Sequence, residues 1–156
     1  MDRAVSDAAE ILGDEISLDV SARRAASVDV DAETVALVER ALDSEREMLA
    51  TFFSQPLTER EGAGFLRYGP GGFYGPHRDR GIVPSWPGAA RRTVAVVVFL
   101  NDGFTGGMLR LLDESGPRPI VPHEGTLVAF AADTLHEVVP VVDGTRDTVV
   151  DWFYRG

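Results

Sequence analysis

From residue 62 onward, the chain consists of short apolar or alternating runs that are separated by glycine, proline and aspartate. No second long helical pattern interrupts this series. Short strands at regular spacing, with turn-forming residues between them, are typical of a β-sandwich or jelly roll. The runs are GFLRY, GGFYGPH, RRTVAVVVFLND, GGMLRLLD, GTLVAFA, LHEVVPVV and DTVVDWFYR. We therefore predict a jelly-roll core over residues 62–156.

One amphipathic helix is predicted in front of this core, over residues 31–54. An aspartate at position 29 or 31 is a suitable N-cap, and Gln55-Pro56 ends the pattern. The apolar residues recur at helical spacing on one face, which we expect to pack against the sheet: Val35, Val38, Leu42, Leu49 and Phe52.

Residues 1–30 are rich in alanine and acidic residues, and they predict either a short helix near residues 5–12 or a mobile lead-in. The expected fold class is mainly β with N-terminal helices (α+β). A length of 156 residues suits one domain. In that domain, residues 1–61 are expected to form a helical support, and residues 62–156 the jelly-roll core.

Composition excludes several kinds of chemistry. The chain contains no cysteine, so disulfides, thiolate metal sites and cysteine nucleophiles are excluded. Lysine is absent, which excludes a Schiff-base mechanism. A net charge of −10 disfavours binding to nucleic acid. The sequence has no run of 18 apolar residues and no apolar signal core. We expect a cytoplasmic protein without a membrane partner.

A histidine and an aspartate stand two residues apart at His77 and Asp79. On a strand, side chains at i and i+2 share one face. His136 opens a later run and can supply a third ligand. Two histidines and one carboxylate make the facial triad of non-haem Fe(II) oxygenases. Such a pair also arises by chance, so these three residues leave ordinary polar histidines open as the alternative.

Arg146 follows His136 by ten residues and opens the last run. A buried arginine needs an anion, and its planar fork suits a carboxylate. Fe(II) with one aspartate and two neutral histidines carries one net positive charge. A dicarboxylate such as 2-oxoglutarate then leaves one negative charge for Arg146 to neutralise. The alternative is a surface arginine paired with Asp143 or Asp147.

The order His-x-Asp, then His, then Arg resembles the Fe(II)- and 2-oxoglutarate-dependent dioxygenases, in particular their prolyl-4-hydroxylase-like branch. The resemblance covers residues 65–155 and lies in LRYGPGGFYGPHRD, RTVAVVVFLNDGFTGGMLRL and PHEGTLVAFAADTLHEVVPVVDGTRDTVVDWFYR. It implies a double-stranded β-helix, which is a distorted jelly roll, backed by N-terminal helices. It also implies a hydroxylase that uses Fe(II), 2-oxoglutarate and O2 and releases succinate and CO2.

The resemblance assigns roles to particular residues. It implies that the iron ligands are His77, Asp79 and His136, and that no further catalytic residue is needed. Arg146 matches the residue that binds the distal carboxylate of 2-oxoglutarate, and Tyr68 matches a tyrosine of the same pocket. Thr148 shares the face of Arg146 and is a further candidate contact, with core packing as the alternative. Trp152 also shares this face, and we interpret it as a core residue.

The substrate is less constrained by the sequence. Prolyl hydroxylases commonly carry lysine at the position of Arg146, so a small molecule, a free amino acid or a peptide side chain all stay open. The nucleic-acid repair branch carries a second arginine where this chain has Trp152, which argues against that branch. Residues 80–92 predict a loop over the site, with Arg80 and Trp86 as candidate substrate contacts. The alternative function is a non-catalytic jelly-roll protein that binds a metal or ligand.

Overall fold

The computed structural model describes residues 2–3, 22–81 and 87–156. In chain order the elements are β1 (Asp2–Arg3), β2 (Arg23–Arg24), β3 (Ala26–Val28), α2 (Ala32–Ser44), α3 (Arg46–Phe53), β4 (Leu57–Arg60), β5 (Gly64–Tyr68), β6 (Phe73–His77), the 3-10 helix η2 (Pro87–Arg91), β7 (Arg92–Phe99), β8 (Thr105–Gly106), β9 (Leu109–Asp113), β10 (Gly116–Ile120), β11 (Leu127–Ala131), β12 (His136–Val138), β13 (Val141–Asp143) and β14 (Arg146–Arg155).

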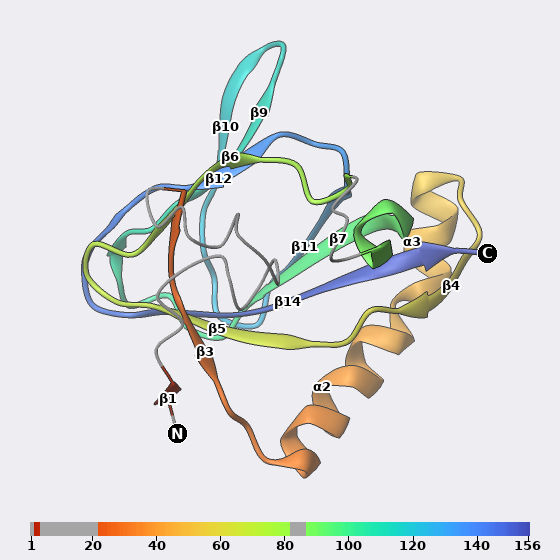
Figure 1. Cartoon of the computed structure of the whole chain (residues 1–156), viewed down its shortest axis with the longest axis horizontal. Helices are drawn as coiled ribbons and strands as arrows, with labels where there is room; N and C mark the ends of the chain where they lie inside the picture. The colour runs from red at the N-terminus through yellow and green to blue at the C-terminus, as the bar shows by residue number, and fades with distance from the viewer. Residues whose placement is uncertain (1, 4–21, 82–86) are drawn as a thin grey trace.

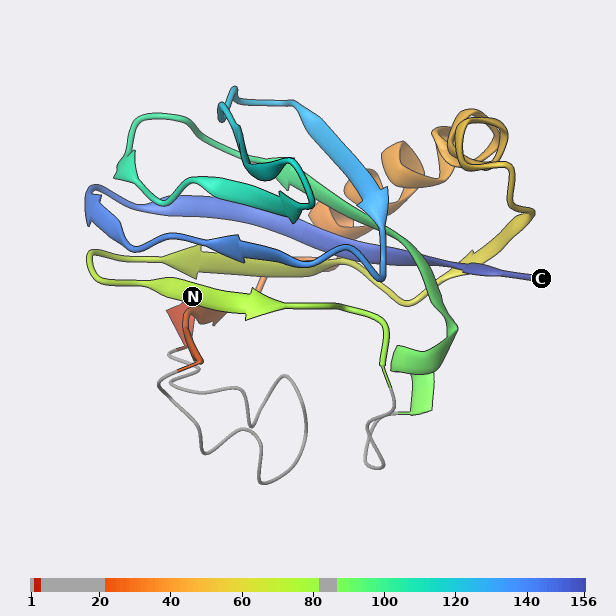
Figure 2. The same cartoon turned by 90° about the horizontal axis from the view of Figure 1, so that it is seen from above.

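Two antiparallel sheets face each other in the part of the chain that is described (Figure 1 and Figure 2). The larger sheet has the order β1-β3-β5-β14-β7-β11, with β4 paired to β14, and the smaller has the order β10-β9-β12-β6-β2. Strands β8 and β13 form a separate pair. The predicted fold class is confirmed, a mainly β jelly roll with helices before it. None of the described helices has the length and apolarity to cross a membrane.

Strand β7 shows why the longest apolar run has no polar alternation. Val94 and Val96 pack with Leu49 in a cluster between the larger sheet and the helices. Ala95 and Val97 point the other way, into the core between the two sheets. Because successive side chains of a strand alternate between faces, a strand that is covered on both sides needs apolar residues at every position.

The predicted helix is present as two helices, α2 and α3, which Glu45 separates. Asp31 caps α2, because its side chain accepts a hydrogen bond from a backbone N–H of the first turn at 2.8 Å. Leu42 and Leu49 are buried on either side of this break, so their seven-residue spacing is kept across it. Within α3, Phe53 packs against the core on the helix side, whereas Phe52 is 76% exposed. The prediction that Phe52 packs against the sheet is wrong, because the core-facing phenylalanine is four residues after Leu49 and not three.

Residues before the helices contribute strands as well, which the sequence analysis did not predict. Strand β3 pairs with β5 of the larger sheet, and β2 pairs with β6 of the smaller one. These strands are two and three residues long, too short to show an alternating pattern, and they form through pairing with distant strands. The short helix expected near residues 5–12 lies outside the described residues.

Candidate active site

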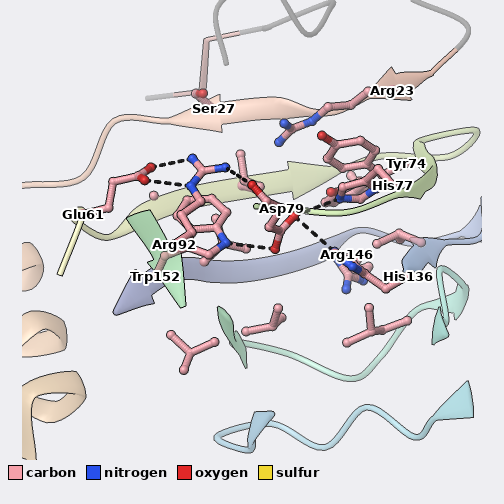
Figure 3. A pocket seen from close by; sticks show the side chains of 18 of the residues that line it. Arg23, Ser27, Glu61, Tyr74, His77, Asp79, Arg92, His136, Arg146 and Trp152 are labelled. Atoms are coloured by element: carbon pink, nitrogen blue, oxygen red, sulfur yellow. Dashed lines mark hydrogen bonds and ion pairs between the residues drawn. The ribbon is translucent and has the colours of Figure 1, made fainter. Parts of the chain in front are cut away.

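A cavity of about 230 Å³ lies between the two sheets, and we refer to it as the central cavity (Figure 3). The two sheets both contribute to its walls, which combine apolar side chains with a few charged ones. Such a lining is typical of small-molecule sites. The charged residues of the described lining, apart from histidine, are Arg23, Glu61, Asp79, Arg92 and Arg146.

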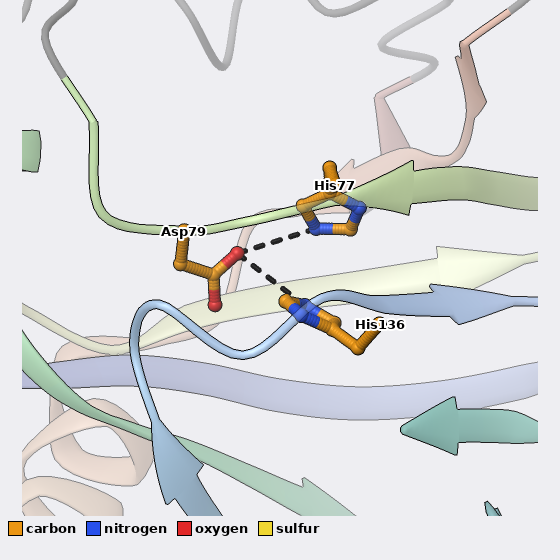
Figure 4. Close-up of side chains that lie close together, drawn as sticks. All are labelled: His77, Asp79 and His136. Atoms are coloured by element: carbon orange, nitrogen blue, oxygen red, sulfur yellow. Dashed lines mark ion pairs between the residues drawn. The ribbon is translucent and has the colours of Figure 1, made fainter. Parts of the chain in front are cut away.

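Two histidines of the central cavity are direct neighbours across the smaller sheet. His77 is the last residue of β6, His136 is the first residue of β12, and the two are register partners. Side chains of directly opposite residues lie close together on one face of a sheet. The ring centroids are 4.1 Å apart. Residues that are 59 positions apart in the chain thus converge through strand pairing (Figure 4).

Asp79 lies in a bend after the end of β6, so the prediction that it shares a strand face with His77 is wrong. The backbone N–H groups of Asp79 and Arg80 both donate to the carbonyl of Ala132, at 3.0 and 2.9 Å, and this holds the bend. The carboxylate turns toward the histidines: Asp79 Oδ1 is 3.2 Å from His77 Nε2 and 3.4 Å from His136 Nε2. The three ligand atoms lie within 4.8 Å of one another.

The other nitrogen of each ring fixes its tautomer. His77 Nδ1 lies 2.7 Å from the carbonyl of Gly75, and His136 Nδ1 lies 2.8 Å from the carbonyl of Thr134. A carbonyl only accepts, so each Nδ1 carries the hydrogen and each neutral ring presents an Nε2 lone pair. Two lone pairs that face the oxygen of Asp79 repel it unless a cation lies between them. This donor set fits a divalent metal with open positions.

Without a metal, a proton on Nε2 takes the place of the cation and makes a hydrogen bond to Asp79 possible. Burial favours the neutral form of Asp79, but hydrogen bonding with His136 and His77 keeps the pKa of its carboxyl well below the usual range. Burial lowers the pKa of His77. Burial acts in the same direction on His136, but the hydrogen bond and charge of Asp79 outweigh it and raise the pKa of that ring. A metal that binds between these groups replaces a proton, as is usual for histidine sites.

The second oxygen of Asp79 is held by Trp152, whose Nε1 donates to Oδ2 at 2.9 Å. The guanidinium of Arg92 lies 3.6 Å above the Trp152 ring, and Glu61 accepts two hydrogen bonds from Arg92, at 2.7 and 2.6 Å. Trp152 packs against the core, as predicted, but it also orients the carboxylate. Partners of this kind fix the direction of a metal ligand.

Trp152→Phe keeps the aromatic packing and removes the N–H group. We expect about a tenfold loss of metal affinity, because Asp79 Oδ2 loses its donor and the carboxylate is free to rotate. The measurement is titration calorimetry of metal-free protein with Mn(II), with circular dichroism to show that the fold is retained. An affinity equal to that of the unsubstituted protein would exclude Trp152 as a positioning residue.

Arg146 reaches the central cavity from β14 of the larger sheet, opposite its register partner Tyr68. The residue is 2% exposed, and its guanidinium carbon lies 4.9 Å from the centroid of the Tyr68 ring. Its Nε is buried, and among the described residues it has no hydrogen-bond partner. Asp147, one of the two surface partners considered from the sequence, pairs with Arg67 instead. Burial lowers the pKa of Arg146, but the guanidinium stays charged.

A buried cation without an anion is costly. The orphaned donor of Arg146 therefore marks a place for a negatively charged group in the central cavity, and a carboxylate matches its planar fork. Close backbone approach makes room for this side chain. Gly107 has a φ of +62°, and a Cβ there would lie 3.2 Å from Arg146 Cδ.

The structure places the remaining sequence candidates as follows. Tyr68 is buried and lines the central cavity. Thr148 is fully buried and its hydroxyl has no partner in the part of the chain that the structure describes, but it is outside the described lining. Arg80 pairs with Asp133 at 2.7 Å, away from that lining. Trp86 lies outside the described residues.

Sequence reasoning missed Arg23, Glu61 and Tyr74, which line the central cavity. Tyr74 lies three residues before His77 in the chain, and its ring stacks on His77 with centroids 3.5 Å apart. No local signal identified Arg23 or Glu61, because strand pairing and long-range packing bring both of them to the cavity.

Comparisons with known proteins agree with this geometry. The family model described as "2OG-Fe(II) oxygenase superfamily" matches residues 63–154. A PKHD-type hydroxylase from Shewanella sp. (strain ANA-3) is 33% identical over 90 residues, which are 56% of this chain and 40% of that protein. Another from Parvibaculum lavamentivorans is 35% identical over 92 residues, with 56% and 41% covered. The chain thus spans about two fifths of the length of these curated relatives.

Solved structures share the fold. A crystal structure of a Pseudomonas putida prolyl-4-hydroxylase superposes with a TM-score of 0.72 at 26% identity, and covers 100% of this chain and 92% of that one. A prolyl hydroxylase from Trichoplax adhaerens, in complex with a peptide fragment of hypoxia inducible factor, gives a TM-score of 0.67 at 22% identity, with 85% and 63% covered. The second likeness supports the fold alone.

Proposed function

The chain belongs to the 2OG-Fe(II) oxygenase superfamily, and from this premise we propose that it is a hydroxylase that acts with Fe(II), 2-oxoglutarate and O2 and releases succinate and CO2. The observation that carries the proposal is one cavity in which a His-Asp-His triad and an unpaired buried arginine meet. We also propose that residues 1–156 act as one oxygenase domain.

The ligands of the iron would be His77, Asp79 and His136. Bound together, Fe(II), 2-oxoglutarate and O2 supply the oxidising power that inserts oxygen into a C–H bond. Three protein ligands leave positions open for exchangeable ligands. The neutral histidines and the single carboxylate leave one net positive charge at the metal, which favours an anionic chelating co-substrate.

Arg146 would hold the distal carboxylate of 2-oxoglutarate, with Tyr68 beside it. The ion pair forms where water is scarce, and charges attract more strongly at a low effective dielectric constant. The apolar walls from Leu66, Val97 and Val150 exclude water from the reacting centre. The chain would thus balance the charge of the co-substrate, orient it and exclude water from the cavity.

For the substrate, we propose a small molecule or an amino-acid or prolyl-type group. The names of the relatives support this class: PKHD-type hydroxylases and a prolyl-4-hydroxylase. A non-catalytic jelly-roll protein is the less favoured alternative, because such a protein has no need of both a metal triad and an orphaned arginine. Location in the cytoplasm stays a prediction.

The proposed activity is tested in two steps. Anaerobic addition of Fe(II) and then 2-oxoglutarate is expected to produce a visible charge-transfer band. Admission of O2 is then expected to convert 2-oxoglutarate to succinate, slowly without substrate and faster with a substrate from a screen. Protein loaded with Zn(II) is the control and forms no succinate. Absence of both the band and succinate would refute the proposal.

A further inference from the structure

A second buried arginine enters the central cavity from the opposite sheet. Arg23 of β2 is 3% exposed, and its Nε has no hydrogen-bond partner. Within residues 2–3, 22–81 and 87–156, its guanidinium forms no ion pair, although the same cavity contains Asp79 and Glu61. Glu61 forms an ion pair with Arg92, and the carboxylate of Asp79 faces the two histidines. A buried guanidinium without a counter-charge indicates a missing anion.

Tyr74 fixes the position of Arg23. The guanidinium carbon of Arg23 lies 4.5 Å from the centroid of the Tyr74 ring, and Tyr74 stacks in turn on His77 at 3.5 Å with 10° between the ring planes. Figure 3 shows Arg23 extending from β2 over Tyr74. A contact with the face of an aromatic ring makes no use of the N–H donors of a guanidinium, so they are free for a carboxylate. Tyr74 thus contacts both Arg23 and the proposed metal ligand His77.

The charges of the cavity leave room for one more anion. Three arginines and two carboxylates give the described lining one net positive charge when the histidines are neutral. Fe(II) adds two positive charges, and 2-oxoglutarate removes two. The loaded cavity therefore keeps one positive charge. Arg146 and Arg23 come from different sheets. A co-substrate that has one carboxylate at Arg146 and chelates the metal with the other has no carboxylate left for Arg23.

We propose that the substrate is a small aliphatic carboxylic acid, such as a free amino acid, and that Arg23 binds its carboxylate. This inference rests on the proposed function and names its substrate class. A carboxylate held beside Tyr74 positions the carbon chain of the substrate next to the metal ligands. The size of the cavity agrees, because about 230 Å³ also has to accommodate 2-oxoglutarate.

A binding experiment without turnover tests the proposal. Protein loaded with Zn(II) and 2-oxoglutarate is titrated calorimetrically with free L-amino acids and short aliphatic acids, each paired with its carboxamide. We expect at least one acid to bind about 10- to 100-fold more tightly than its amide, as for a charge-assisted hydrogen bond. Arg23→Gln is expected to remove this preference and to leave the affinity for 2-oxoglutarate within about threefold.

The controls separate charge, geometry and folding. Arg24→Gln changes the exposed neighbour on the same strand, and it is expected to keep the preference for the acid. Arg23→Lys keeps the charge but loses the planar fork, so it is expected to retain part of the preference. It also serves as the folded comparison if the glutamine variant is unstable.

Two results would overturn the proposal. One is an equal ratio of acid affinity to amide affinity in Arg23→Gln and in the unsubstituted protein, and the other is a panel in which no acid is preferred. An equal loss of 2-oxoglutarate affinity would assign Arg23 to the co-substrate instead. Peptides that are capped at both ends are tested last. If only a capped peptide with an Asp or Glu side chain binds in a way that depends on Arg23, the carboxylate belongs to a peptide side chain, and the free acid is refuted as its source.

Activity without added substrate separates this inference from the proposed function. Succinate formation is measured in the unsubstituted protein and in the surface control Arg24→Gln, where it reports on iron and 2-oxoglutarate alone. If the unsubstituted protein forms no succinate and shows no charge-transfer band, the proposed function fails. If succinate and the charge-transfer band are both observed, but Arg23→Gln does not change the preference for the acid, only the substrate assignment fails.

Discussion

Asp79→Ala is expected to abolish the iron-dependent conversion of 2-oxoglutarate to succinate. Asp79 supplies the only carboxylate of the triad, and its Oδ1 lies 3.2 and 3.4 Å from the two histidine Nε2 atoms. Without it, two neutral nitrogens face a divalent cation in a largely buried cavity, and no ligand charge offsets the cost of dehydrating the metal. Succinate is measured by NMR, and bound iron by elemental analysis after anaerobic loading.

Asp133→Ala is the matched control for this experiment. Asp133 is close to His136 in the chain but is exposed. Its surface ion pair with Arg80 contributes little to the free energy of unfolding. We expect full activity in this variant. Asp79→Asn adds a second comparison, because it keeps the size of the side chain and an oxygen for Trp152 but removes the charge. Succinate formation by Asp79→Ala at the rate of the unsubstituted protein would refute the metal assignment.

Arg146→Gln is expected to weaken 2-oxoglutarate binding by about 2–5 kcal/mol, which is at least about 30-fold. The variant leaves a buried carboxylate of the ligand without its cation, and burial makes that loss larger than at a surface. Metal affinity is expected to change by less than about threefold, because Arg146 is not a member of the triad. Calorimetric titration with 2-oxoglutarate at saturating Zn(II) measures the first effect, and titration of metal-free protein with Zn(II) measures the second.

Two further variants sharpen this result. Arg118→Gln removes an exposed arginine of the β9–β10 hairpin and is expected to leave both affinities unchanged. Arg146→Lys keeps the charge without the planar fork, so we expect an intermediate affinity. A 2-oxoglutarate affinity unaltered by Arg146→Gln would remove Arg146 from its proposed role, and an equal loss of metal binding would indicate a general disturbance of the cavity.

Local patterns were sufficient for the strand that is buried on both faces and for the start of the first helix, where Asp31 was one of two candidate caps. The apolar run around β7 predicts a strand because both faces of that strand are covered and need apolar residues. The start of α2 is predicted by Asp31, which accepts a hydrogen bond from the first turn. The break at Glu45 was not predictable from apolar spacing, since the buried Leu42 and Leu49 keep a helical spacing across it. The same spacing did not distinguish Phe52, which is exposed, from Phe53, which packs against the core.

The sequence by itself determined the chemistry of the triad and the class of fold, because His77, Asp79, His136 and Arg146 are recognisable by type and order along the chain. Only the tertiary structure decided how these residues are held. The bend that turns Asp79 back, and the N–H of Trp152 that holds its second oxygen, depend on groups far away in the chain.

Arg23 is the clearest case of a tertiary effect. It lies on a two-residue strand that forms through pairing with β6, so no periodic pattern in the sequence predicts it. Its meaning comes from burial without a counter-charge, and burial is a property of the packed sheets rather than of neighbouring residues. Residue type specifies what chemistry is possible, whereas long-range strand pairing decides which charges meet in one cavity and which of them are left without partners.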